Sequence, residues 1–247
     1  MDRKINFSLE RKKMGDFTDR TRMLIGEHGV KILKQSAVAV FGLGGVGSYV
    51  AEALGRAGIG HLALIDKDVI SESNINRQLI ALTSTVGMKK TQVMAARLKD
   101  INPQVTVELF DLFYLPQTAD QVDLNRFDYV VDAVDTVSAK VELAVRANAC
   151  GVPIISCMGT GNKMDPSRLE IADIYRTSVC PLARAMRSQL KKAGVQQLKV
   201  LYSTESSCGA VLDENGRHAP GSISFVPSVA GLMCAGEVIR DLLKVRM

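Results

Sequence analysis

The chain has 247 residues, 47% of them hydrophobic and 23% charged, a composition typical of a globular protein with room for one sizeable core. No apolar run reaches the roughly 18–20 residues that span a bilayer, and the N-terminal segment lacks the apolar stretch of a secretory signal. A formal net charge of +5 is compatible with an acidic partner such as RNA and does not by itself establish one.

Cysteine usage argues against a metal or disulfide framework. The five cysteines are odd in number and form no CxxC pair, which disfavours both a zinc knuckle and a disulfide-stabilised fold. We therefore expect a reducing, cytoplasmic environment and no membrane contact. Three of the cysteines lie in apolar stretches and are predicted to be small core residues: Cys150, Cys157 and Cys234.

The N-terminal region is predicted to begin with a basic, loosely docked arm, because residues 1–16 have little hydrophobic periodicity. Thr18 and Asp19 are suited to cap a helix that holds Arg20 and runs to about residue 25. A second short helix, over residues 30–34, leads into the first strand.

The stretch 36–68 organises the prediction of the fold. An apolar β-branched run at 37–41 reads as a buried parallel strand, and the glycine-rich turn 42–47 follows it. A helix over 49–56 and a second strand over 61–65 come next, and the strand ends in Asp66. This order predicts the phosphate-binding half of a doubly wound sheet, with backbone N–H groups and a helix N-terminus facing a phosphate. The alternative is a glycine turn kept only for close helix packing.

Alternating elements continue to residue 158. After a polar loop at 67–78, the predicted elements are a helix within 88–102, strands at 105–109 and 127–132, a helix at 138–150 and a strand at 153–158.

The pattern changes after residue 159. The predicted elements are an antiparallel strand at 169–174, a basic helix at 181–193, a strand at 199–203, a polar loop at 206–221, a strand at 222–226 and a long apolar helix at 227–243. We therefore predict an α/β fold with a doubly wound, Rossmann-like, mostly parallel sheet and an antiparallel C-terminal extension. One domain, 1–247, would comprise a nucleotide-binding half, 18–158, and a substrate-facing half, 159–247.

Polar residues around the glycine turn distinguish this chain from an ordinary dinucleotide oxidoreductase. Two cations, Arg77 and Lys90, lie one loop apart, and Asp135 follows the end of the fourth strand, where doubly wound sheets bind ligands. Such a set suits a triphosphate with a divalent metal, and therefore nucleotidyl transfer rather than hydride transfer.

The motifs of this chain resemble those of a known family of enzymes. GLGGVG, Asp66-x-Asp68, Asn74-x-x-Arg77-Gln78, Gly87-x-x-Lys90 and Asp135 resemble the adenylation domain of ubiquitin-activating enzymes and of the molybdopterin and thiamine sulfur-carrier adenylyltransferases. Over nearly the whole chain, RTRMLIG, GVGSYVAEALGRAGIG and GTGNKMDPSRLEIADIYRTSVCPLARAMR resemble the tRNA threonylcarbamoyladenosine dehydratases more closely.

The resemblance implies a role for each matching position. Asn74, Arg77 and Lys90 would hold the ATP phosphates, Asp135 would bind Mg²⁺, and Arg20 would reach the neighbouring subunit's ATP site in a homodimer. The remaining implied ATP-binding residues are Gly42, Gly44, Gly45, Gly47, Asp66, Asp68 and Gln78. Asp66 would accept a hydrogen bond from a ribose hydroxyl, and Asp68 either contacts the ligand or orients Arg77.

The resemblance also implies a reaction. The carboxylate of threonylcarbamoyl-adenosine in the tRNA anticodon loop would attack the α-phosphate of ATP, giving an acyl-adenylate and pyrophosphate. An internal oxygen or nitrogen of the modification would then close onto the activated carbonyl and expel AMP. Because AMP replaces oxide as the leaving group, no protein nucleophile is required.

Three other functions stay open on the sequence. They are a sulfur-carrier adenylyltransferase acting on a protein C-terminus, an NAD-dependent oxidoreductase and a non-catalytic tRNA-binding module. Cys180 and Cys208 are candidates for a thioester or persulfide role, with a sulfur-transfer protein as partner.

The basic helix at 181–193 is either a solvent-exposed face or a contact to tRNA phosphates through Arg184, Arg187, Lys191 and Lys192. Lys163 and Asp173 either contact the substrate or only form part of the surface of the second half of the chain.

Overall fold

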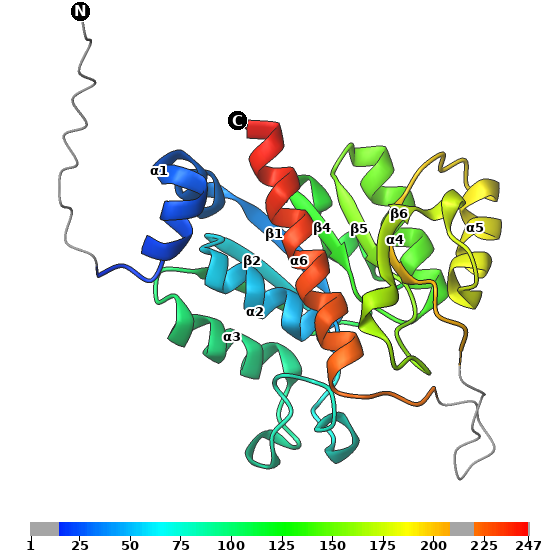
Figure 1. Ribbon diagram of the computed structural model, residues 1–247, viewed down its shortest axis with the longest axis horizontal. Helices are drawn as coiled ribbons and strands as arrows, with labels where there is room; N and C mark the ends of the chain where they lie inside the picture. The colour runs from blue at the N-terminus through cyan, green and yellow to red at the C-terminus, as the bar shows by residue number, and fades with distance from the viewer. Residues whose placement is uncertain (1–14, 208–219, 247) are drawn as a thin grey trace, which may run out of the picture.

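A single seven-stranded sheet forms the centre of the molecule (Figure 1), in the strand order β3-β2-β1-β4-β5-β7-β6. The computed structural model describes residues 15–207 and 220–246. The strands are β1 (Ala37–Phe41), β2 (His61–Ile65), β3 (Thr106–Phe110), β4 (Tyr129–Asp132), β5 (Ile154–Cys157), β6 (Leu169–Asp173) and β7 (Lys199–Ser203).

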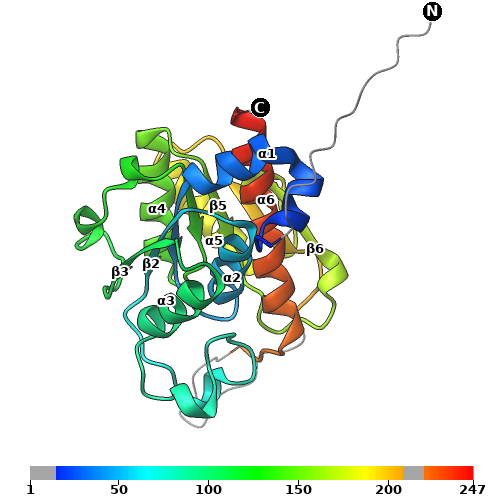
Figure 2. The same cartoon turned by 90° about the vertical axis from the view of Figure 1, so that its left-hand side faces the viewer.

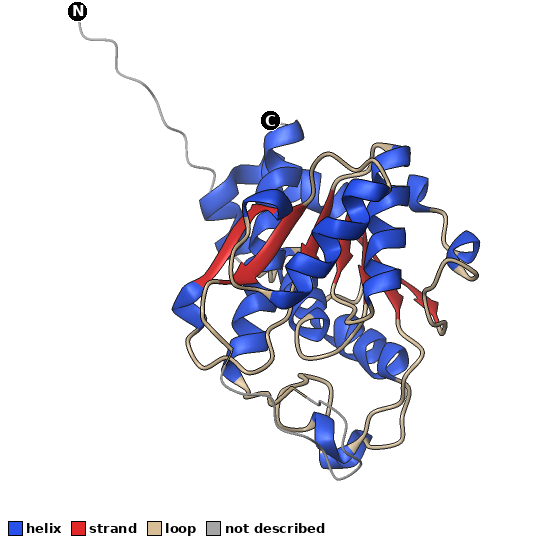
Figure 3. Ribbon diagram, turned by 90° about the vertical axis from the view of Figure 1, so that its right-hand side faces the viewer, coloured by secondary structure: helices blue, strands red, loops and turns tan. Residues whose placement is uncertain are grey.

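Helices cover both faces of the sheet, so the fold has three layers (Figures 1 and 3). The apolar faces of α2, α3 and α6 pack on one side, and those of α4 and α5 pack on the other. Helix α1 lies against α6 (Figure 2). The helices are α1 (Asp19–Gln35), α2 (Gly47–Ala57), α3 (Lys90–Ile101), α4 (Val137–Cys150), α5 (Pro181–Lys192) and α6 (Phe225–Arg246).

The direction of the strands confirms the predicted fold class. All neighbouring pairs are parallel except β6 and β7, which pair antiparallel at one edge. Connections run outward from β1 to β2 and β3, and in the opposite direction from β4 to β5. The order therefore reverses between β1 and β4, and a crevice opens beyond the carboxyl ends of these two strands, the usual place for a ligand in such sheets.

The glycine turn after β1 folds as its sequence predicts. Gly42 has a φ of +85°, and a β-carbon there would lie 2.7 Å from the carbonyl oxygen of Ala133. Glycine is therefore required both by the backbone conformation and by the close approach of the loop after β4. Helix α2 begins directly after this turn, so its N-terminal N–H groups face the crevice.

One predicted element is wrong. Residues 222–224 are not a strand, and Phe225 and Val226 already belong to α6. Val226 and Ala230 are both fully buried at the four-residue spacing of one helix face, so the apolar residues at 225–226 belong to the helix pattern. The two predicted N-terminal helices are the two parts of α1, which are separated by a kink at Gly26, where a φ of +73° and a ψ of 174° are not helical. Other predicted boundaries shift by a few residues.

Within the described ranges, no helix is both long enough and apolar enough to cross a membrane. Cys150 corrects another expectation, because it is exposed at the end of α4 whereas Cys157 and Cys234 are buried as predicted. The basic N-terminal arm, up to residue 14, and Cys208 lie outside the described residues.

Candidate active site

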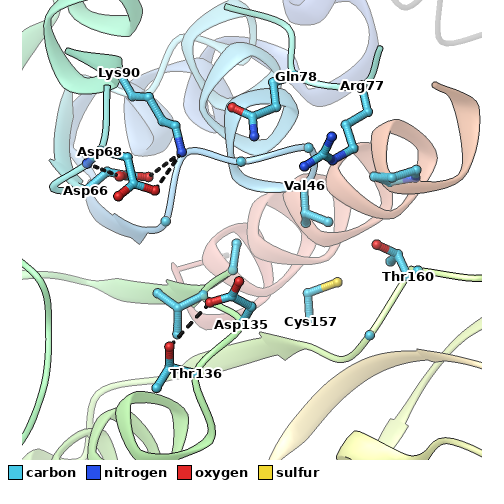
Figure 4. A pocket seen from close by; sticks show the side chains of 18 of the residues that line it. Val46, Asp66, Asp68, Arg77, Gln78, Lys90, Asp135, Thr136, Cys157 and Thr160 are labelled. Carbon is cyan, nitrogen blue, oxygen red and sulfur yellow. Dashed lines mark hydrogen bonds and ion pairs between the residues drawn. The ribbon is translucent and has the colours of Figure 1, made fainter. Parts of the chain in front are cut away.

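A cavity of about 540 Å³ occupies the crevice at the carboxyl ends of β1 and β4. The glycine turn and the 66–78 segment line one side of it, and residues 133–136 and 157–161 line the other (Figure 4). Residues from both 18–158 and 159–247 therefore line the cavity. Most of the predicted site residues meet here.

Asp66 fixes the glycine turn to the end of β2. Its Oδ2 accepts a hydrogen bond of 2.7 Å from the backbone N–H of Leu43, and its Oδ1 accepts one of 2.8 Å from the N–H of Asp68. The side chain is only 9% exposed. Both oxygens keep further lone pairs, so the carboxylate can still accept a ribose hydroxyl from the cavity side.

Lys90 lies at the start of α3 with its side chain only 7% exposed. Its Nζ donates to Asp68 Oδ2 at 3.0 Å and lies 3.9 Å from Asp66 Oδ2 (Figure 4). The neighbouring turn is anchored independently, because Lys89 and Thr91 both donate to Asp111 and lower the pKa of that carboxyl. The ammonium is therefore held at the cavity edge in a fixed position, as a binding site for phosphate requires.

The loop before α3 supplies three more of the predicted site residues, Asn74, Arg77 and Gln78. Asn74 caps a short turn, with its Oδ1 accepting from the N–H of Ser71 at 3.2 Å. The Nη1 of Arg77 donates to the carbonyl of Ser73 and to Oδ1 of Asn76, each at 2.8 Å. These contacts hold the guanidinium on the cavity wall opposite Asp135 (Figure 4).

Gln78 is the strongest sign that the cavity receives a polar ligand. Its side chain lines the cavity and is only 7% exposed. Among the described residues, its Oε1 has no hydrogen-bond partner. An unpaired buried amide oxygen is costly, so a donor supplied by a ligand or its bound water would stabilise the site.

Asp135 lies in the loop after β4 and is exposed toward the cavity. Its Oδ1 accepts a weak hydrogen bond from the hydroxyl of Thr136 at 3.3 Å. The described residues contain no cluster of three metal-ligating side chains. A single carboxylate beside a triphosphate site nevertheless fits Mg²⁺, which is commonly held by one or two carboxylates together with substrate phosphates and water.

Several predicted residues lie elsewhere. Gly47 begins α2 outside the cavity lining, where a β-carbon would lie 1.7 Å from the carbonyl oxygen of Gly42. Arg20 is exposed at the start of α1 and does not line the cavity of its own chain. On α5, Arg184, Lys191 and Lys192 are exposed, whereas Arg187 donates from Nη1 to the carbonyl of Thr177 at 3.1 Å and also to its hydroxyl.

The sequence reasoning missed a buried ion pair beneath the cavity. Lys140 of α4 and Asp132 of β4 are both fully buried, with Nζ 3.1 Å from each carboxylate oxygen. The same Nζ donates to the carbonyl of Cys157 at 2.7 Å, and the Ser156 hydroxyl also donates to Asp132. Asp132 in turn accepts from the N–H of Val134 at 3.2 Å. The pair therefore fixes the ends of β4 and β5 relative to each other.

Replacing Lys140 with methionine is expected to reduce the free energy of unfolding by about 3–5 kcal/mol, because the Asp132 carboxylate would stay buried without its partner. Chemical denaturation measures this change. Arg240→Ala is the control, since it removes a guanidinium that is 57% exposed and whose partner Glu237 keeps its ion pair with Lys199, and it should cost at most about 1 kcal/mol. Equal losses in both variants would show that the buried pair contributes no more than a surface one.

The chain is similar to known proteins over most of its length. A sequence model of the ThiF family matches residues 18–247. A tRNA threonylcarbamoyladenosine dehydratase of Bacillus subtilis is 43% identical over 240 residues, which are 91% of this chain and 94% of that protein. Crystal structures of the E. coli tRNA N6-threonylcarbamoyladenosine dehydratase TcdA with AMP and with ATP give TM-scores of 0.84 and 0.82 at 31% identity, covering 92% of this chain and 93% of each of those chains.

Proposed function

The chain belongs to the ThiF family, and we propose that it is an ATP-dependent enzyme that dehydrates the threonylcarbamoyl-adenosine modification of tRNA to its cyclic form. The observation that carries this proposal is the near full-length similarity to dehydratases, including one solved with ATP and with AMP. We also propose that the enzyme acts in the cytoplasm, because tRNA is present there.

ATP would bind with its phosphates along the glycine turn and the N-terminus of α2. Lys90 and Arg77 would contact the phosphates from one wall, with Asn74 and Gln78 beside them. Both cations are already held at the cavity edge, so little reorganisation is needed when negative charge develops on the leaving pyrophosphate. Asp66 would accept hydrogen bonds from the ribose.

Asp135 would hold Mg²⁺ against the phosphates, where a bound divalent cation neutralises phosphate charge. The role of the chain's own residues is to place two reactants together. The carboxylate of the modification attacks the α-phosphorus, the new O–P bond forms, and the bond to the β-phosphate oxygen breaks. The two halves of the cavity wall bring these groups into contact.

The second step closes the ring. An internal oxygen or nitrogen of the threonylcarbamoyl group attacks the activated carbonyl carbon, a proton is lost, and the carbonyl–oxygen bond to AMP breaks. The tRNA loses the elements of water, and ATP becomes AMP and pyrophosphate. The chain needs no covalent intermediate of its own for this sequence.

The assembly and the tRNA surface belong to the same proposal. We expect a homodimer in which Arg20 of one subunit completes the ATP site of the other. Helix α5 would contact tRNA phosphates through Arg184, Lys191 and Lys192, which are exposed. Arg187 would instead stabilise the turn at 174–177, since its guanidinium is already bound there. Residues 18–158 would serve the nucleotide and 159–247 the substrate.

Mass spectrometry of tRNA nucleosides tests the function directly. Incubating the protein with tRNA carrying the linear modification and Mg-ATP should convert it to a product lighter by one water, with one AMP per product. NAD should neither bind in calorimetry nor replace ATP. Conversion without ATP, or binding of NAD but not of Mg-ATP, would contradict the proposal.

Cys208→Ala should retain at least about half of the wild-type turnover, because the substrate's own atom closes the ring. The measurement is the rate of tRNA conversion together with AMP release. The competing function, adenylation of a sulfur-carrier protein, can use a cysteine for thioester or persulfide chemistry. A variant that forms the adenylate normally and no longer cyclises would therefore indicate a covalent intermediate.

A further inference from the structure

Residues 220–224, here called the strap, cross between the two walls of the cavity. The backbone N–H of Asn162 donates to the carbonyl of Gly221 at 2.8 Å, and the N–H of Gly221 donates to Oδ1 of Asn162 at 2.6 Å. On the other side, Nδ2 of Asn76 donates to the carbonyl of Ser222 at 3.0 Å. The two anchors are the adjacent residues Gly221 and Ser222, and Pro220 and Ser222 line the cavity.

Asn162 adopts an unusual backbone conformation to make its two bonds. Its φ is +55°, and the only other non-glycine residue in the described ranges with a positive φ is Val179. Asparagine tolerates the left-handed region better than most residues, and here its side-chain oxygen binds the strap. An outlier that is held by specific contacts beside a candidate active site suggests that its geometry is used.

The loop that carries Asn162 is itself rigidly attached. The carboxylate of Glu205, just after β7, accepts from the N–H groups of Met164 and Asp165, each at 2.9 Å. Lys163 is 5% exposed and donates to the carbonyl of Glu205. Thr160, at the near end of this loop, lies at the cavity wall (Figure 4).

The other anchor reaches the side of the cavity that carries Lys90 and Arg77, here called the phosphate wall. The side-chain amide of Asn76 uses both of its ends, because Nδ2 binds the strap while Oδ1 accepts from Nη1 of Arg77 at 2.8 Å. A continuous series of contacts therefore runs from the loop at 159–165 through Asn162, the strap and Asn76 to the guanidinium of Arg77.

We propose that Asn162 is a positioning residue, which through the strap sets the separation between the phosphate wall at Arg77 and the substrate wall at Thr160. This inference rests on the proposed function, because the substrate's carboxylate must meet the α-phosphate between these walls. A displacement of about 1 Å in such a site can reduce the rate by about 10²-fold. Mg-ATP would be held by Lys90, Arg77 and Asp135, each of which has an anchor other than Asn162, so its binding should depend little on Asn162.

Two substitutions at the same position separate the side-chain bond from the backbone conformation. Asn162→Gly accepts a positive φ at no steric cost but cannot accept from Gly221. Asn162→Asp keeps an acceptor and also tolerates the left-handed region. We expect the glycine variant to lose about 10- to 100-fold in kcat/KM for tRNA while its Kd for Mg-ATP stays within about threefold. The aspartate variant should retain kcat/KM within about threefold, and Asn148→Ala on α4 is the matched control.

A double-mutant cycle tests the connection to Asn76. If both asparagines act through the strap, Asn76→Ala with Asn162→Gly should lose little more in kcat/KM than the worse single variant. Independent roles would multiply the two losses and would overturn the proposal. It is also overturned if Asn162→Gly matches the wild type, or if it weakens Mg-ATP binding as much as tRNA turnover. A wild-type protein that binds Mg-ATP and leaves tRNA unchanged would instead reject the proposed function.

Discussion

Asp135→Ala is expected to lower AMP formation by at least about 10²- to 10³-fold while leaving the fold intact. The carboxylate faces the cavity and accepts only a long hydrogen bond, 3.3 Å, from its neighbour Thr136. Its removal should therefore change the free energy of unfolding by about 0.5 kcal/mol or less, as for other exposed positions. In the proposed function, the variant would lose the carboxylate that holds Mg²⁺ beside the ATP phosphates, and with it the stabilisation of charge on the departing pyrophosphate.

AMP release during tRNA conversion and the unfolding midpoint together measure this expectation. Asp120→Ala is the matched control, since that carboxylate is 89% exposed and pairs with Arg146 outside the cavity lining. The control should keep wild-type turnover. A folded Asp135→Ala protein with unchanged turnover would remove Asp135 from the site, and an unfolded one would assign it a structural role.

Local sequence signals were sufficient to bring the glycine turn and two carboxylates to the cavity. The glycine turn and Asp66 directly follow β1 and β2, and Asp135 lies three residues after the end of β4, so the general rule for parallel sheets places them at one edge of the sheet. Lys90 also lines the cavity, and its pairing with Asp68 was not predicted. That pairing depends on how the loop between residues 66 and 90 folds back on itself, and hydrophobic periodicity contains no information about this.

The contacts between distant segments could not be predicted in the same way. Lys140 resembles a solvent-facing lysine of an amphipathic helix, yet it is fully buried because Asp132 and the Cys157 carbonyl surround it. Asn162 and Gly221 are separated by 59 residues and Asn76 and Ser222 by 146. No spacing rule links such pairs, and the mistaken strand at 222–226 concealed the strap entirely.

Arg20 raises a different question, because it lies at the start of α1 and not at its own chain's cavity. Three apolar residues near it in the sequence have exposed side chains: Phe17, Met23 and Leu24 are 48%, 70% and 86% exposed. Neighbouring exposed apolar side chains are typical of a protein–protein contact. This supports the proposal that α1 packs on a second copy and that Arg20 enters the copy's ATP site, where a guanidinium can bind phosphate oxygens in a planar fork.

Mixed dimers give the sharpest test of this arrangement. Arg20→Ala and Asp135→Ala should each be nearly inactive alone, with losses of about 10²-fold or more. Co-expressed, they should recover roughly a quarter of wild-type activity, because half of the dimers are mixed and one of two sites in each pairs an intact Arg20 with an intact Asp135. The measurement is AMP release by purified mixtures whose heterodimer content is known from differently tagged subunits. Heterodimers that form and remain inactive would show that Arg20 acts within its own subunit or only stabilises α1.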